Sequence, residues 1–196
     1  MPMILNKADF KKLHDELEEA DSQREHIIKE ARDVLKGSKT MIYSVQRNEL
    51  NHAGKLKEEL KKDLKKVVEK CRKFPDLYYS GSIKVAEQEF VEALCFYEFV
   101  KNKSLPTVSD LGVTSENYLL GLCDLSGELT RKAINASIKE NYDETLAIWE
   151  FLETLYGELM RFDFRNSELR RKFDGIKYDL QKIENVVLEL KLKNKV

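Results

Sequence analysis

Hydrophobic residues recur along this chain at alternating spacings of three and four, the pattern of a helix with one buried face. The pattern is longest at the two ends of the chain, where it forms seams with heptad spacing. The N-terminal seam, after a predicted cap at Asn6, consists of Phe10, Leu13, Leu17, Ala20, Arg24, Ile27, Ala31, Val34, Ser38, Met41 and Val45. The C-terminal seam consists of Leu169, Phe173, Ile176, Leu180, Ile183, Val187 and Leu190. Each seam predicts a long helix.

Between the seams, capping residues and helix breakers divide the chain into four further predicted helices. Residues 51–54, with the sequence NHAG, are the predicted end of the first long helix. The second predicted helix runs from Leu56 to near Pro75, and the third covers about residues 82–103. The fourth covers about residues 116–139, and the fifth runs from a cap at Asn141 to near Arg161. No useful length of the chain alternates with a period of two, so no strand is predicted. The expected fold is all-α: an antiparallel bundle of about six to seven helices in a single domain, residues 1–196.

Two long apolar seams in a chain of 196 residues offer more apolar edge than one bundle readily covers. Part of this edge is therefore expected to contact another subunit, which predicts an oligomer. The alternative is that the two seams close on each other within one chain.

Composition limits the classes of function. The chain is 42% hydrophobic and 35% charged, with only eight Gly and three Pro, which fits long helices. Its 34 Lys and Arg nearly balance 35 Asp and Glu, so any surface that attracts nucleic acid must be local. The cysteines Cys71, Cys95 and Cys123 lack the spacing of a disulfide framework or a zinc site. Without an apolar stretch long enough to span a bilayer, the protein is expected to be soluble and cytoplasmic, with no membrane partner.

The third predicted helix carries Glu89 and Glu92 on an apolar flank. On a helical wheel of about 100° per residue their neighbours are Val85, Phe96 and Phe99, and the water-facing side holds Lys84, Glu87 and Glu98. Carboxylates on an apolar flank must be neutralised by a proton, a cation or a metal, because isolated buried charge is very unfavourable. Mg²⁺, or alternatively Mn²⁺, fits such carboxylate oxygens.

The fourth predicted helix places four polar residues on one stripe, Asp124, Glu128, Arg131 and Asn135. Gly121 and Gly127 flank this stripe in mid-helix, where each costs about 1 kcal/mol relative to alanine. Close approach by another group would explain them, and we expect Asp124 to face the Glu89/Glu92 pair. The alternative is an internal salt-bridge network in which Arg131 neutralises Glu128 and the glycines only allow close packing of helices.

The first predicted helix also carries a basic stripe with one aromatic residue, formed by Arg32, Lys36, Lys39, Tyr43 and Arg47. Such a stripe can follow the phosphates of an RNA while the tyrosine stacks on a base, although most runs of charge are simply solvated faces. The lysines of residues 55–73 alternate with acids and are interpreted as ordinary surface. A second basic cluster that could guide RNA contains Arg161, Arg165, Arg170, Arg171 and Lys172.

Four segments carry a resemblance to a known family: RDVLKGSKTMIYSVQR, EQEFVEALCFYEFVKNKSL, YLLGLCDLSGELTRKAIN and KYDLQKIENVVLELK. Together they resemble the translin family, and within it the translin-associated factor X (TRAX-like) subunits rather than translin itself. The chain has no long insertion before YLLG, and in this respect it resembles a compact prokaryotic or archaeal relative.

The resemblance implies an all-helical subunit of hollow octamers that hold RNA, with metal-dependent ribonuclease activity in the factor X type of subunit. It places the catalytic, metal-binding acids at Glu89, Glu92 and Asp124, with Glu128 as an auxiliary catalytic acid. Translin itself lacks this acidic set.

The predicted function is therefore a Mg²⁺-dependent endoribonuclease acting on single-stranded RNA or RNA with single-stranded regions. The predicted RNA contacts are the basic stripe and Arg131. The predicted assembly is a homo-oligomer, expected to be an octamer, or a hetero-oligomer with a translin-like subunit.

Two alternatives remain. One is a non-catalytic RNA-binding or scaffold subunit. The other is an all-helical Mg²⁺-dependent nucleotide pyrophosphatase, which also uses a Glu-x-x-Glu pair. Its second motif is Glu-x-x-Asp, whereas this chain has Asp124-x-x-x-Glu128.

Overall fold

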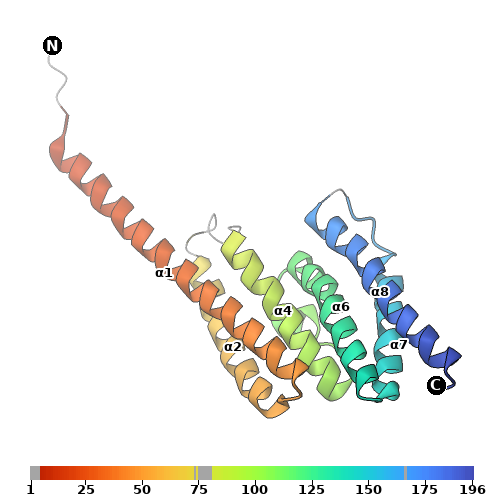
Figure 1. Ribbon diagram of the computed structural model, residues 1–196. Coiled ribbons are helices and arrows are strands. Elements are labelled where there is room, and N and C mark those ends of the chain that lie inside the picture. The colour runs from red at the N-terminus through yellow and green to blue at the C-terminus, as the bar shows by residue number, and fades with distance from the viewer. Residues whose placement is uncertain (1–4, 73, 75–80, 166) are drawn as a thin grey trace.

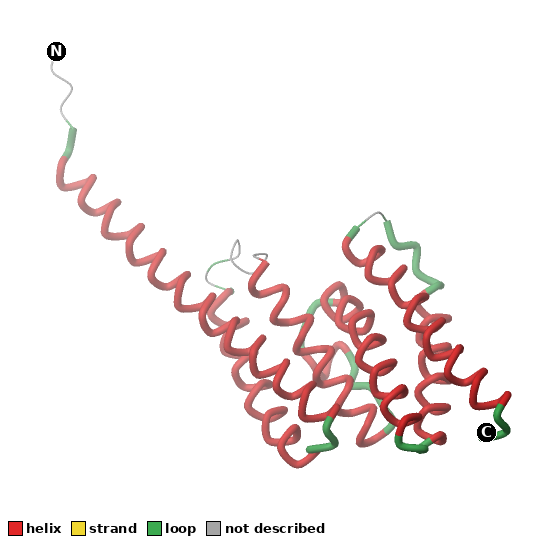
Figure 2. Tube along the Cα trace, in the orientation of Figure 1, coloured by secondary structure: helices red, strands yellow, loops and turns green. Residues whose placement is uncertain are grey.

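The structure is a computed structural model that describes residues 5–72, 74, 81–165 and 167–196. Within these residues it contains helices and no strand, which confirms the all-helical prediction (Figure 2). The helices are α1 (Lys7–Gln46), α2 (Leu50–Cys71), α4 (Gly81–Asn102), α5 (Val108–Leu111), α6 (Ser115–Ile138), α7 (Tyr142–Leu159) and α8 (Glu168–Leu192). The predicted helix end near Pro75 lies outside the described residues. In the described part of the chain, no helix is both long enough and apolar enough to cross a membrane.

Four long helices, α1, α4, α6 and α8, lie side by side and run in the same direction (Figure 1). Helix α2 runs antiparallel to them and packs on α1 and α4, and α7 does the same on α6 and α8. Helices joined by short turns are thus antiparallel. The longer connection through α5 instead returns the chain along α4, so that Asn117 near the start of α6 donates a hydrogen bond to Glu87 near the start of α4.

The two heptad seams are buried on different helices. All seven residues of the C-terminal seam are buried, where α8 packs on α6 and α7. The N-terminal seam is buried only from Ile27 onward, where α1 packs on α2 and α4. Before that point α1 projects from the bundle, and Phe10, Leu13 and Leu17 are exposed (Figure 1). The alternative in which the seams close on each other is therefore wrong.

The first helix ends earlier than predicted, at Gln46, and residues 51–54 lie inside α2. The turn is made by Asn48, whose φ of 62° lies in the left-handed region that asparagine tolerates better than most residues. The buried Lys132 ammonium donates to Asn48 Oδ1 at 2.6 Å and holds this turn against α6. Gly54 permits close packing instead of ending the helix, because a Cβ there would lie 2.9 Å from the Tyr97 hydroxyl.

Helices α4 and α6 pack closely at Gly121. A Cβ at this position would lie 2.7 Å from Val91 Cβ and 2.8 Å from the carbonyl oxygen of Gln88, distances that side chains do not tolerate. This approach brings the acidic residues of the two helices together, since Glu89 and Asp124 are close neighbours of the contact in sequence.

We expect Gly121→Ala to lower the free energy of unfolding by roughly 1–3 kcal/mol, because the strain of overpacking outweighs the helix preference of alanine. The control is Gly157→Ala on α7, where a Cβ meets nothing within 4 Å. That substitution should raise stability by up to about 1 kcal/mol. Chemical denaturation of both variants measures the difference, and equal stability of the two would contradict the close contact.

Candidate functional site

A cavity of about 470 Å³ lies between α4, α6 and α8. The residues that line it are Glu89, Glu92, Cys123, Asp124, Gly127, Lys172, Gly175 and Asp179. The structure thus brings together Glu89, Glu92 and Asp124, which come from two helices. The glycines of α6 and α8 leave room beside the acids, since a Cβ at Gly175 would meet nothing within 4 Å and one at Gly127 only Asp179, at 3.7 Å.

Glu92 is the most buried of the three predicted ligands, with 7% of its surface exposed. Burial raises its pKa from 4.5 to about 9, and the negative charges of Glu89, Asp124 and Glu128 add to the rise. In the absence of a cation Glu92 is therefore protonated at neutral pH. A bound cation would favour the charged carboxylate instead.

The other two acids are also perturbed by burial. Burial raises the pKa of Glu89, the nearby Lys39 ammonium opposes this rise, and Asp124 adds to it. Burial likewise raises the pKa of Asp124, against the effect of its hydrogen bond from Lys172. Acids whose pKa values are shifted by burial and by neighbouring charges cluster at functional sites, so this cavity is a candidate active site.

Lys172 reaches the cavity from α8 and holds Asp124. Its Nζ donates to Asp124 Oδ2 at 2.5 Å and to Gln88 Oε1 at 3.3 Å. The cavity thus contains one ammonium among three predicted ligand carboxylates.

Glu128 lies beside the cavity, on the side of α1. Its Oε2 accepts a hydrogen bond from Gln46 Nε2 at 2.6 Å. Arg131, the partner proposed in the salt-bridge alternative, lies 3.9 Å from the same oxygen and is mostly exposed, so that ion pair contributes little. Glu128 is therefore fixed mainly by α1, and Arg131 remains free to contact a ligand.

The prediction of which side of α4 faces water is wrong. Glu87 is completely buried and accepts a hydrogen bond from Asn117, and Glu98 is mostly buried and pairs with Lys57 at 2.7 Å. Val85, expected on the apolar flank, is 44% exposed. The reason is that α4 is covered by α1, α2 and α6, whereas the wheel assumed that only one side of the helix was buried.

The acids of the cavity have the chemistry of a magnesium site but do not form a closed ligand shell. Among the described residues, the only three potential ligands with atoms within 4.8 Å of one another are His14, Asp15 and Glu18, all exposed on the projecting part of α1. Glu89, Glu92 and Asp124 are more widely spaced. Their carboxylate oxygens nevertheless suit a hard divalent cation. Their raised pKa values show that the charged carboxylates are disfavoured at this site, and a bound cation would favour them.

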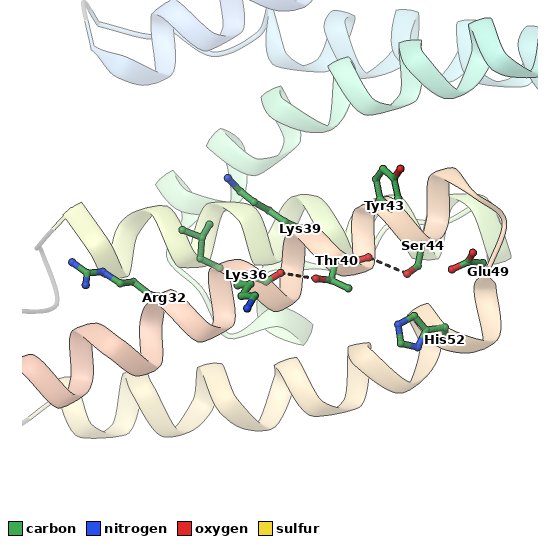
Figure 3. Close-up of a pocket in the computed structure, with 9 residues that line it drawn as sticks. Arg32, Lys36, Lys39, Thr40, Tyr43, Ser44, Glu49 and His52 are labelled. Atoms are coloured by element: carbon green, nitrogen blue, oxygen red, sulfur yellow. Dashed lines mark hydrogen bonds between the residues drawn. The ribbon is translucent and has the colours of Figure 1, made fainter.

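The predicted basic stripe lines a second cavity, of about 580 Å³, on the surface of α1 (Figure 3). Its lining includes Arg32, Lys36, Lys39 and Tyr43, together with Leu35, Thr40, Ser44, Glu49 and His52. Arg47 lies next to this cavity, with its guanidinium carbon 5.7 Å from the centre of the Tyr43 ring. Tyr43 itself is 55% exposed, so one face of α1 presents both cations and an aromatic ring.

Comparison with known proteins identifies the family. Residues 22–194 match the Translin family. The chain belongs to the translin family. A protein of Methanocaldococcus jannaschii is 34% identical over 163 residues, covering 79% of this chain and 70% of that protein. Translin-associated protein X of Pongo abelii is 25% identical, covering 94% of this chain and 78% of the relative. Human translin is 35% identical over only 78 residues, about a third of its length.

Solved structures show the same translin-family fold over nearly the whole chain. The apo-NeC3PO structure has a TM-score of 0.84 and 32% identity, covering 96% of this chain and 98% of that one. A complex of AfC3PO with duplex RNA has a TM-score of 0.85 and 25% identity, covering 94% and 97%.

Two residues of the site in this translin-family chain were not predicted from its sequence. Lys172 was assigned to a basic cluster near a loop, and Asp179, which accepts hydrogen bonds from Ser126 and Lys182, was not singled out. A signal was present, because Lys172, Gly175 and Asp179 are spaced by three and four and form a stripe next to the apolar seam of α8.

The stability of the metal-free protein is expected to depend on pH through Glu92. Its pKa is about 9 when folded and ordinarily 4.5, so the folded state binds more protons between these values. The contribution of Glu92 to stability is therefore fully present below pH 4.5 and is lost as the pH rises towards 9. Glu92→Gln removes this loss, so in EDTA its Tm should exceed that of the wild type at high pH, by an amount that shrinks towards pH 5.

The control for this measurement is Glu153→Gln, which changes an exposed acid of α7. It should follow the wild-type curve at every pH. If Glu92→Gln and the wild type lost stability in parallel with rising pH, Glu92 would not be the titrating group.

Proposed function

We propose that this translin-family chain is a Mg²⁺-dependent endoribonuclease that acts on single-stranded RNA, or on RNA with single-stranded regions, inside an oligomeric shell. The observation that carries the proposal is the convergence of Glu89, Glu92 and Asp124 on one cavity, each with a raised pKa. Without a bound cation, burial of these acids costs stability, since it forces a proton onto Glu92 and leaves Asp124 dependent on Lys172.

In this proposal Glu89, Glu92 and Asp124 hold the metal, and Glu128 is an auxiliary acid at the edge of the site. When bound, Mg²⁺ would polarise a phosphoryl oxygen and lower the pKa of water. The chain's own cations, Lys39 and Lys172, flank the acids and would attract the phosphate. Water attacks phosphorus in line with the 3′ oxygen, and the P–O3′ bond breaks, which leaves a 5′-phosphate and a 3′-hydroxyl.

The basic stripe supports RNA as the substrate. Lys39 both lines the cavity on α1 and opposes the rise in the pKa of Glu89, so the stripe leads directly to the acids. Arg131, exposed on α6, would extend the contact beyond Glu128. The similarity to AfC3PO, whose structure was solved with duplex RNA, supports the same class of ligand.

The exposed seam residues of α1 support assembly. Phe10, Leu13 and Leu17 continue the buried seam into a part of α1 that projects from the bundle, where a neighbouring subunit can cover them (Figure 1). We propose an octamer, built from this chain alone or together with a translin-like subunit.

The first test is cleavage of an end-labelled single-stranded RNA by the purified protein. Cleavage is expected in the presence of Mg²⁺ or Mn²⁺, and EDTA should abolish it. In Asp124→Asn the rate of cleavage should fall by at least about 10²-fold while RNA binding persists, because one metal ligand is lost. Asp143→Asn, an exposed acid on α7, is the matched control and should cleave normally.

The products distinguish the mechanism. Ends carrying a 5′-phosphate and a 3′-hydroxyl are expected, whereas 2′,3′-cyclic phosphate would show attack by the RNA's own 2′-hydroxyl. RNA binding with no cleavage under any divalent cation would favour the non-catalytic scaffold, and hydrolysis of nucleoside triphosphates but not RNA would favour a pyrophosphatase.

RNA binding is expected to depend on the stripe. Tyr43→Ala should weaken binding of single-stranded RNA by about 1–3 kcal/mol, the usual contribution of one stacked base. Lys36→Gln should reduce the slope of log K against log salt by about 0.7, the effect of one lost phosphate contact. Lys62→Gln, on the exposed face of α2, should change neither quantity. Fluorescence anisotropy at several salt concentrations, without divalent cations, measures both.

A further inference from the structure

Lys172 occupies a position among the acids that a divalent cation would need. Its Nζ contacts Asp124 Oδ2, an oxygen of a proposed metal ligand, and Gln88 Oε1 provides a second acceptor. We propose that Lys172 is the resident counter-cation of the metal-free site, that a divalent ion must displace it from Asp124, and that it thereby sets the ion concentration at which the site fills. The inference rests on the proposed function, since it concerns the same metal site.

The contact is built into the fold and is not a chance pairing of surface chains. Lys172 lies between Leu169 and Phe173, two buried seam residues that fix this turn of α8 against the bundle. Gln88 is buried, with 4% of its surface exposed, and its Nε2 has no hydrogen-bond partner among the described residues. The ammonium is therefore held in a polar pocket in which one donor remains unsatisfied.

The other cations of α8 are placed differently. Lys182 pairs with Asp179 and is mostly exposed, and Arg170 pairs with Asp174 at the surface. The remaining three, Arg171, Lys177 and Lys191, are exposed. Among the cations of α8, Lys172 alone lines the cavity that contains Glu89, Glu92 and Asp124.

Competition explains why the ligands do not form a closed shell. While Lys172 donates to Asp124 Oδ2, this oxygen is engaged by the ammonium and is not free to complete a shell with Glu89 and Glu92. A divalent ion carries twice the charge of the ammonium and can accept oxygens from all three acids at once. Its binding would therefore release Lys172 towards the cavity, where the phosphate is proposed to lie.

A purely supporting role makes the opposite prediction. If Lys172 only orients Asp124 for the metal, removing it weakens metal binding. If Lys172 competes with the metal, removing its charge strengthens metal binding, because a charge-assisted hydrogen bond no longer has to be broken. As a positioning residue that acts through Asp124, Lys172 can be tested by the sign of this effect.

The experiment is a calorimetric titration of the RNA-free, full-length protein with Mn²⁺. Lys172→Gln should bind Mn²⁺ roughly tenfold more tightly than the wild type, since the loss of one charge-assisted contact corresponds to at least this factor. Lys172→Arg keeps the charge and should restore the wild-type affinity. Lys177→Gln removes a charge from the exposed face of the same helix and should leave the affinity unchanged. The heat of Mn²⁺ binding that is lost in Asp124→Asn is the heat that comes from this site.

A second measurement needs no variant. The rate at which Lys172 of the wild type reacts with an acetylating reagent, followed by mass spectrometry, should rise several-fold when Mg²⁺ is added, while the rate at Lys177 stays constant. This reports release of the ammonium even if Lys172→Gln does not fold.

The outcomes separate the inference from the proposed function. Unchanged or weaker Mn²⁺ binding by Lys172→Gln, or a reactivity of Lys172 that ignores Mg²⁺, overturns the inference and leaves the metal site intact. If neither the wild type nor Lys172→Gln shows binding that Asp124→Asn removes, the metal site of the proposed function is absent, and the inference fails with it.

Discussion

Acidic side chains buried between apolar helices are the constraint on which the structure and the proposed chemistry of this chain depend. Glu92 lies on α4, the helix most enclosed by its neighbours, and a carboxylate there can be accommodated only with a proton, an ammonium or a metal ion. The helices on either side of the acids supply Lys39 and Lys172. These lysines only partly compensate the acids, which is the physical basis of the proposed affinity for a divalent cation.

The parallel direction of the helices places the acids and Lys172 at the same height along the bundle. Because α4, α6 and α8 run in parallel, Glu89, Asp124 and Lys172 lie near one another although they are far apart in sequence. The connection through α5 makes this possible, since a tight turn after α4 would have reversed α6 and moved Asp124 away from the glutamates. Gly121 then allows the two helices to approach closely enough for the acids to share a cavity.

Features encoded by local spacing could be predicted from the sequence. The caps at Asn6 and Asn141 and the buried seam of α8 follow from capping chemistry and periodicity. The convergence of Glu89, Glu92 and Asp124 joins two helices, and it was predicted from their placement on the helix faces together with the family resemblance. Where neither spacing nor resemblance gave a signal, distant contacts decided the structure. The end of α1 depends on Asn48 and on Lys132, 84 residues later, and the burial of Glu87 depends on α6 covering a side of α4 that appears polar.

The uninterrupted length of α1 has a mechanical consequence. This single helix of 40 residues carries exposed apolar side chains at its projecting end and the basic stripe nearer its other end. Since the helix is continuous from one part to the other, the orientation of the projecting end is linked to that of the stripe. A subunit that packs on the projecting end would therefore also orient the stripe. In the proposed assembly, subunit packing far from the acids would thus determine the path along which an RNA strand reaches them.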